Sequence, residues 1–185
     1  MRGFCLIAAG SLAFNTFFIF MPNNQISRHG TGLTPTLLWT AAALAAVAGA
    51  ALALGRLSDR VGRRPVAIGS CAALVIFALP ASLLATRGSH LGLVLAQVAI
   101  GVAVAGVLSI AMLGEAFPAP MRSTGVALTA GVATALVGGT APGIDQILVG
   151  VTAGELAPGV YVAAIGCLAL IALWKWPETA FSTLD

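Results

Sequence analysis

Six long apolar runs occupy most of the chain, and this pattern restricts its fold more than any other feature. Hydrophobic residues make up 59% of the 185 positions and charged residues only 8%, which is too little charge to cover a water-soluble domain. A helix needs about 20 mainly apolar residues to cross a bilayer. The runs cover residues 4–22, 35–54, 66–86, 91–114, 124–151 and 159–176. We therefore predict an all-α membrane protein, with one domain of six transmembrane helices over residues 1–185.

The basic residues are unevenly divided between the segments that join these runs. With a cytoplasmic N-terminus, the inner set is Arg2, Arg56, Arg60, Arg63, Arg64, Arg122 and Lys175, and the outer set is Arg28 and Arg87. Cytoplasmic segments are enriched in arginine and lysine, so we predict that both termini are cytoplasmic. The net charge of +3 follows from this topology. The six apolar runs predict the lipid bilayer as a partner, and the net charge gives no reason to expect nucleic acid.

The fifth run is longer than a single straight crossing requires. It contains Gly138, Gly139 and Pro142 within five residues. Proline removes a backbone hydrogen bond, and glycine weakens the same stretch of helix. The sequence therefore predicts a bend here, which serves either as a simple packing kink or as a hinge that lines a cavity.

Three charged residues lie where the helix macrodipole disfavours them. Asp59 follows the second run and Glu115 ends the fourth, near negative helix ends, whereas Arg122 opens the fifth, near a positive end. Each placement costs ~0.3–1 kcal/mol locally. A chain with so few charges is expected to place them there only if they have partners.

We predict that these charges pair with one another on the cytoplasmic face. The expected pairs are Arg63 or Arg64 with Glu115, and Arg122 with Glu178. The alternative is a set of solvated ions that contribute little individually.

Three motifs that contain these charges resemble the major facilitator superfamily. The segment Gly55–Pro65 resembles the signature loop between the second and third helices of each six-helix half. Glu115 and Arg122 have the Glu-x6-Arg spacing found after a fourth helix, and Pro177–Thr179 resembles the Pro-Glu-Thr motif after a final helix. The resemblance implies a conformational gate made of Asp59, Arg60, Arg63, Arg64, Glu115, Arg122 and Glu178.

A narrower resemblance points to the metabolite:proton symporters of that superfamily. It rests on the segments 115–127 and 138–142, together with Met21-Pro22 and the segment 161–164. This family includes carriers of α-ketoglutarate, citrate, shikimate and proline or betaine. The resemblance implies the carboxy-terminal half of a twelve-helix carrier in the inner membrane. That half would move a small organic acid, betaine or similar metabolite with protons, and either an amino-terminal half or a second copy would complete the site.

A few polar residues inside the runs are candidates for that site. Asn15 lies 13 residues beyond Arg2, or ~20 Å along a helix, near the middle of the bilayer. Asn15 and Thr16 are therefore the main candidates for substrate contact, with an interhelical hydrogen bond as the alternative. Gln97 lies farther out, where packing is the favoured role over substrate contact.

Asp145 is an acid within the fifth run, and such acids are often functional. It lies 23 residues past Arg122, or about 35 Å along a straight helix, beyond the apolar core. Depth therefore favours a hydrated residue at the outer mouth, with a gate or proton-uptake role as the alternative.

The remaining residues offer no chemistry of another kind. No Ser–His or Asp–Asp pair lies at one depth within the runs, so we do not expect an enzyme. The cysteines Cys5, Cys71 and Cys167 are dispersed, without metal-ligand or redox spacing, and we expect no cofactor. Two functions remain open: a secondary carrier or its half, and a truncated membrane protein that does not transport or serves only in interactions.

Overall fold

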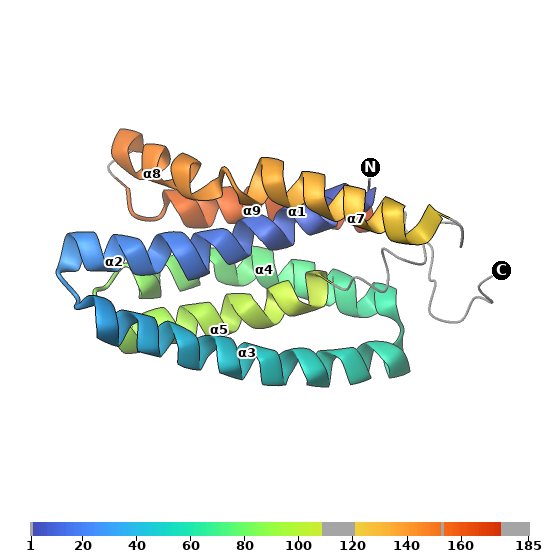
Figure 1. The fold of residues 1–185 in the computed structure, drawn as a ribbon, viewed down its shortest axis with the longest axis horizontal. Coiled ribbons are helices and arrows are strands. Elements are labelled where there is room, and N and C mark those ends of the chain that lie inside the picture. The colour runs from blue at the N-terminus through green and yellow to red at the C-terminus, as the bar shows by residue number, and fades with distance from the viewer. Residues whose placement is uncertain (1, 109–120, 153, 175–185) are drawn as a thin grey trace.

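The computed structural model describes residues 2–108, 121–152 and 154–174, and their regular structure is helical (Figure 1). The elements are α1 (Arg2–Asn15), the π-helical segment η1 (Thr16–Phe20), α2 (Met21–His29), α3 (Leu33–Val61), α4 (Arg63–Ala85), α5 (His90–Val107), α7 (Arg122–Ala133), the π-helical segment η3 (Thr134–Gly138), α8 (Ala141–Thr152) and α9 (Ala157–Trp174). Within the described residues, six helical stretches are long and apolar enough to cross a membrane. This confirms the predicted fold class.

The first of these stretches is longer than the sequence predicted. It runs from Gly3 to His29, whereas the expected run ends at residue 22. Pro22 lies in the first turn of α2, where a helix does not need the proline's missing N–H group. The proline therefore does not end the helical stretch.

The first stretch lies at the centre of the bundle. α1 packs against α5, α9, α7 and η3, while α4 packs against both α5 and α9. Figure 1 shows α7 and α8 along one side and α3 along the opposite side, with α1 and α2 between them. The largest buried side chains of the core include Leu12, Phe17 and Met21 from this central stretch.

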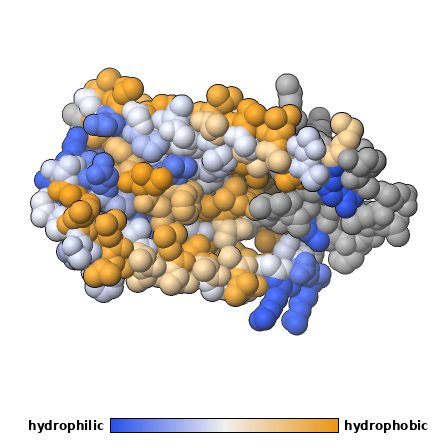
Figure 2. Space-filling view, viewed as in Figure 1, coloured by the Kyte–Doolittle hydropathy of each residue, from blue (hydrophilic) through white to orange (hydrophobic). Residues whose placement is uncertain are grey.

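The surface is apolar between polar ends, as a membrane protein requires. Figure 2 shows hydrophilic residues gathered at the end of the bundle that holds α2, and again at the opposite end, with mainly apolar surface between them. Large exposed side chains such as Leu52, Ile76 and Ile171 lie on α3, α4 and α9. In a membrane, lipid or another apolar helix would cover such side chains.

The predicted signature loop is mostly helix. α3 continues to Val61, and only Gly62 separates it from α4, with φ = 108°. That backbone conformation favours glycine strongly. Asp59 and Arg60 therefore lie in the last turn of α3, and the reversal of chain direction is concentrated in one residue.

Two of the transmembrane stretches are interrupted by π-helical segments. In the fifth, η3 is followed by a turn at Gly139 and Thr140 before α8 begins, which is where the sequence predicted a bend. Pro142 lies in the first turn of α8, where it fits without a kink. The first stretch has a similar interruption at η1, which the sequence analysis did not predict. A hinge role for Gly138, Gly139 and Pro142 stays a prediction.

Candidate functional site

A line of polar contacts joins the two interrupted stretches, and we call it the polar seam: Ser11, Asn15, Thr16, Thr134 and Asp145. The hydroxyl oxygens of Ser11 and Thr134 lie 3.0 Å apart. Thr16 Oγ1 and Asp145 Oδ2 form a hydrogen bond of 2.7 Å. The seam therefore links each π segment to the other stretch through side-chain hydrogen bonds.

Gly138 allows the two stretches to approach closely along the seam. A Cβ atom added to Gly138 would lie 2.9 Å from Ser11 Cβ and 3.1 Å from Asn15 Nδ2. Both separations are shorter than ordinary van der Waals contact. A larger residue at position 138 would push α1 and η3 apart.

The structure corrects the prediction that Asp145 is hydrated. Asp145 has no exposed surface, and its carboxylate faces Thr16 of η1. Depth does not say which way a side chain points, and α8 directs this one into the bundle.

The candidate substrate contacts have different environments. Thr16 is fully buried in its bond to Asp145. Asn15 is half-buried, and its amide nitrogen donates to the Ser11 carbonyl of its own helix at 2.8 Å. Asn15 is thus neither enclosed nor freely exposed, and its contact with substrate stays a prediction.

Gln97 has a packing role in this structure. It is fully buried, and its Nε2 donates to the Phe17 carbonyl and to Thr40 Oγ1, each at 3.2 Å. These bonds connect α5 to the π segment of the first stretch and to α3. This is the role that the sequence favoured over substrate contact.

A polar pocket of about 240 Å³ lies between α2 and α8, at the end of the bundle remote from Gly62. Its polar lining residues are Asn23, Asn24, Ser27, Arg28 and Gln146. Sequence reasoning missed this pocket, although the polar run after Pro22 was a signal for it. Gln146 places the pocket next to Asp145 in sequence, so the seam and the pocket are neighbours on α8.

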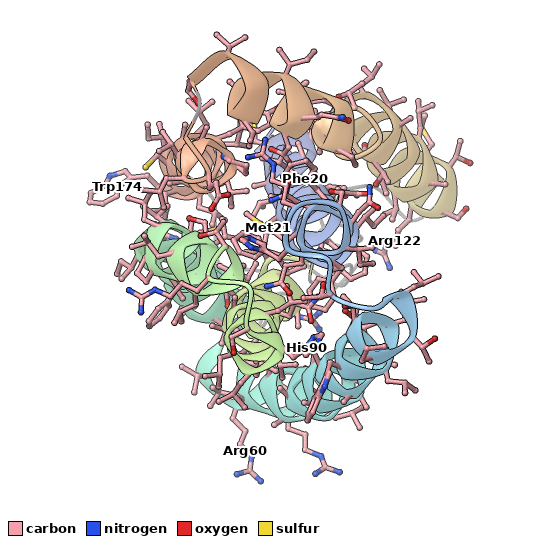
Figure 3. All side chains as sticks on the ribbon, turned by 90° about the vertical axis from the view of Figure 1, so that its left-hand side faces the viewer. Phe20, Met21, Arg60, His90, Arg122 and Trp174 are labelled. Atoms are coloured by element: carbon pink, nitrogen blue, oxygen red, sulfur yellow. The ribbon has the colours of Figure 1, made fainter. Side chains whose placement is uncertain are left out.

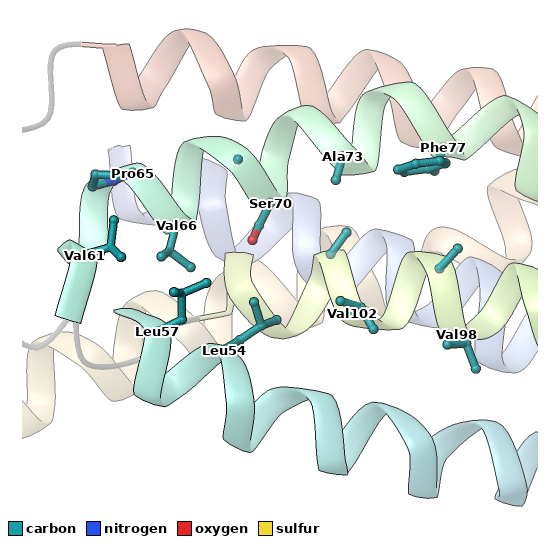
Figure 4. A pocket seen from close by; sticks show the side chains of 13 residues that line it. Leu54, Leu57, Val61, Pro65, Val66, Ser70, Ala73, Phe77, Val98 and Val102 are labelled. Carbon is teal, nitrogen blue, oxygen red and sulfur yellow. The ribbon is translucent and has the colours of Figure 1, made fainter. Parts of the chain in front are cut away.

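A larger cavity of about 630 Å³ lies between α3, α4 and α5 and is apolar (Figure 4). Its walls include Leu54, Phe77 and Val102, and Ser70 is the one hydroxyl among its described lining residues. A small charged metabolite would find almost no hydrogen-bond partner there. The polar seam and its neighbouring pocket are therefore the better candidates for a polar solute.

The predicted charge pairs cannot be placed, because Glu115 and Glu178 lie outside the described residues. Arg64 Nη2 donates to the Trp174 carbonyl at 2.9 Å, which binds the start of α4 to the end of α9. A guanidinium at a helix C-terminus is favourable for the macrodipole.

The other members of the predicted gate lie near the same end of the bundle. Asp59 and Arg60 are exposed, and Figure 3 shows Arg60 pointing away from the helices. Arg63 and Arg122 are half-buried at the starts of α4 and α7. The structure thus leaves Asp59 and Arg60 accessible to a partner outside this chain.

Comparison with known proteins identifies the class of the chain. It is 34% identical over 130 residues to the ectoine/proline transporter of Corynebacterium glutamicum, a match that covers 69% of this chain and 26% of the relative. It is 32% identical over 141 residues to the α-ketoglutarate permease of Escherichia coli, covering 72% of this chain and 32% of the relative. The citrate-proton symporter of Klebsiella pneumoniae is 33% identical over 135 residues, covering 70% and 30%. No protein-family profile matches.

Each of these relatives is a transporter, a permease or a symporter by name, and the described part of this chain has six helical stretches long and apolar enough to cross a membrane. The chain belongs to the metabolite:proton symporters of the major facilitator superfamily. It spans about 30% of the length of the relatives it matches, which is consistent with a carboxy-terminal half.

Proposed function

We propose that this chain is one half of a proton-coupled carrier for a small polar metabolite, an organic acid, a betaine or a similar compound. The observation that carries the proposal is the match to transporters of ectoine or proline, α-ketoglutarate and citrate. A second six-helix half, from the same or another polypeptide or from a second copy, supplies the opposite wall of the site. The carrier resides in the inner membrane, with both termini of this chain in the cytoplasm.

The outer face of α3 supports this arrangement. Only 11% of its most apolar window is buried, compared with 72% for the first stretch. Ala45 and Gly49 are exposed there, and a Cβ atom added to Gly49 would meet nothing within 4 Å. Small residues spaced four apart are typical of helix–helix contacts in membranes, so this face fits another helix.

The fifth stretch presents a second open face. Only 17% of its most apolar window is buried, and it lies on the opposite side of the central stretch from α3 (Figure 1). A second half that contacts both α3 and α7–α8 would cover the central stretch between them. Alternating access then moves one half against the other about a site between them.

The substrate site in this proposal lies against the first stretch. Asn15 contacts the substrate directly, and Thr16 and Gln97 become accessible when the helices around them separate. Gly138, Gly139 and Pro142 form the hinge of the fifth stretch. The gate on the cytoplasmic side consists of Asp59, Arg60, Arg63, Arg64, Glu115, Arg122 and Glu178.

Uptake into proteoliposomes tests the proposal. The chain is reconstituted alone and together with the amino-terminal half of the Corynebacterium relative, and a pH gradient is imposed. Labelled proline, ectoine, citrate and α-ketoglutarate are the substrates. We expect gradient-driven accumulation of at least one of them with both halves present, and none with the chain alone.

Two outcomes would change the assignment. Accumulation by the chain alone would show that two copies form the carrier. If the two halves copurify and none of the four substrates accumulates, the carrier function is wrong and a role limited to interactions is favoured.

A further inference from the structure

The buried carboxyl group of Asp145 lacks the partners that an ion needs. One oxygen, Oδ2, lies 2.7 Å from Thr16 Oγ1, while Oδ1 is buried without a hydrogen-bond partner. Asp145 itself has no exposed surface. Among the described residues, no arginine or lysine forms a salt bridge with it.

The charged and titratable groups around α8 do not supply a counter-ion. α8 packs against α9, η1 and α1. α9 contributes Tyr161 and Cys167, neither of which is a cation, and η1 has no titratable side chain. α2 contributes Arg28 to the polar pocket, and its guanidinium lies 3.7 Å from Glu155.

Burying Asp145 as an ionised carboxylate in this position costs far more free energy than burying it as a neutral acid. A buried charge needs a cation or several donors, and Asp145 has one hydroxyl. A carboxylic acid with its proton on Oδ2 can donate a hydrogen bond to Thr16 Oγ1 over the same distance. Oδ1, which has no partner, is then a neutral carbonyl oxygen and carries no negative charge. We propose that Asp145 is protonated in this packed arrangement and is the residue that binds and releases the coupling proton.

The position of the Thr16–Asp145 bond explains how that proton could control the helices. Thr16 is the first residue of η1, and Asp145 lies in the first turns of α8, just after η3 and its following turn. This bond thus connects the first interruption to the helix that follows the second. π segments occur often at functional sites because they let a helix change register locally.

The polar pocket provides the route for the proton. Gln146, the residue after Asp145, and Val149, one helical turn beyond Asp145 on α8, both line it. When the seam opens, the Asp145 O–H bond breaks, the electron pair stays on the carboxylate and the proton passes to water in the pocket. The carboxylate formed is then hydrated, and closing the seam requires the proton to return.

This inference rests on the proposed function for its role in coupling, but its test needs no transport. Infrared spectroscopy of the purified chain in lipid at neutral pH should show the C=O band of a protonated carboxyl group. Asp145→Asn should remove that band, and Asp59→Asn, at an exposed acid, should leave it. Thr16→Val should shift it to higher frequency, because the acid loses its hydrogen bond.

Each result decides the inference. Absence of a protonated carboxyl band at neutral pH would overturn it, as would a band that survives Asp145→Asn. Because Thr16→Val keeps the acid, it tests the assignment even if the Asn variant does not fold. A Thr16-sensitive band in a chain that fails to transport with any second half would reject the proposed function while leaving the protonated Asp145 intact.

Discussion

The outward faces of α3 and α4 are both apolar, yet they differ in the size of their exposed side chains. α4 exposes large side chains: Ile76, Leu79, Leu83 and Leu84. The central turns of α3 expose mainly small residues, Ala41, Ala45, Ala48 and Gly49, with Leu44 and Leu52 among them. Large aliphatic groups suit contact with lipid, whereas small residues let another helix backbone approach. Exposure alone therefore does not show what covers a membrane helix, and the size of the exposed side chains gives the better indication.

The largest expected effect comes from filling the small face of α3. Gly49→Trp should prevent a second half from binding and abolish uptake by the paired halves. The stability of this chain alone should change by about 0.5 kcal/mol or less, as for other surface substitutions. Copurification and thermal unfolding in detergent measure the two effects. Ile76→Trp on α4 is the matched control, and equal loss of binding in both variants would contradict the distinction between the faces.

The second-largest effect is expected at the polar seam, where the fifth stretch packs against α1. Gly138→Val should destabilise the chain by about 1–3 kcal/mol, the usual cost of overpacking, because the new Cβ meets Ser11 and Asn15. Gly131→Val is the control, since nothing lies within 4 Å of a Cβ there. Unfolding in detergent compares the two variants. Equal stabilities would show that the seam is not closely packed.

A smaller effect is expected at Gln97, whose hydrogen bonds connect α5 to α3 and to the first stretch. Gln97→Leu removes the donor to the Phe17 carbonyl and to Thr40, and should cost about 0.5–2 kcal/mol, the range for hydrogen bonds between membrane helices. Gln146→Leu at an exposed position serves as control. Hydrogen exchange at α3 should rise in the Gln97 variant alone, and unchanged exchange would mean that packing holds α3 without Gln97.

The smallest effect is expected at the salt bridge between Arg28 and Glu155, whose atoms lie 3.7 Å apart. Both side chains are partly exposed, so the coupling energy should be about 0.5 kcal/mol or less and should fall with added salt. A double-mutant cycle with Arg28→Gln and Glu155→Gln measures it. A coupling of several kcal/mol that persists in high salt would reveal a desolvated pair.

The sequence predicted elements better than it predicted contacts. Six apolar runs were enough for the fold class, and the glycines and proline near residue 140 indicated an interrupted helix. These features depend on local composition, which a single sequence shows directly.

The polar seam could not be predicted in the same way. Thr16 and Asp145 are far apart in sequence, and the direction of each side chain depends on how two interrupted helices rotate. The straight-helix estimate placed Asp145 by depth alone and so assigned it to solvent. The π segment at η1 has no proline or glycine within it, so no local signal marked it.

The most direct test of the central claim, that α3 contacts a second six-helix half, is the oxygen accessibility of a spin label on α3. The label is attached to Leu52→Cys, at a side chain 72% exposed, in a variant whose native cysteines are replaced by alanine. A label at Ile76→Cys, where the side chain is 64% exposed, reports on α4. Adding the amino-terminal half of the Corynebacterium relative should lower the oxygen accessibility at position 52 and leave position 76 unchanged. Unchanged accessibility at position 52, with the two halves bound to each other, would show that this face of α3 is not the contact surface.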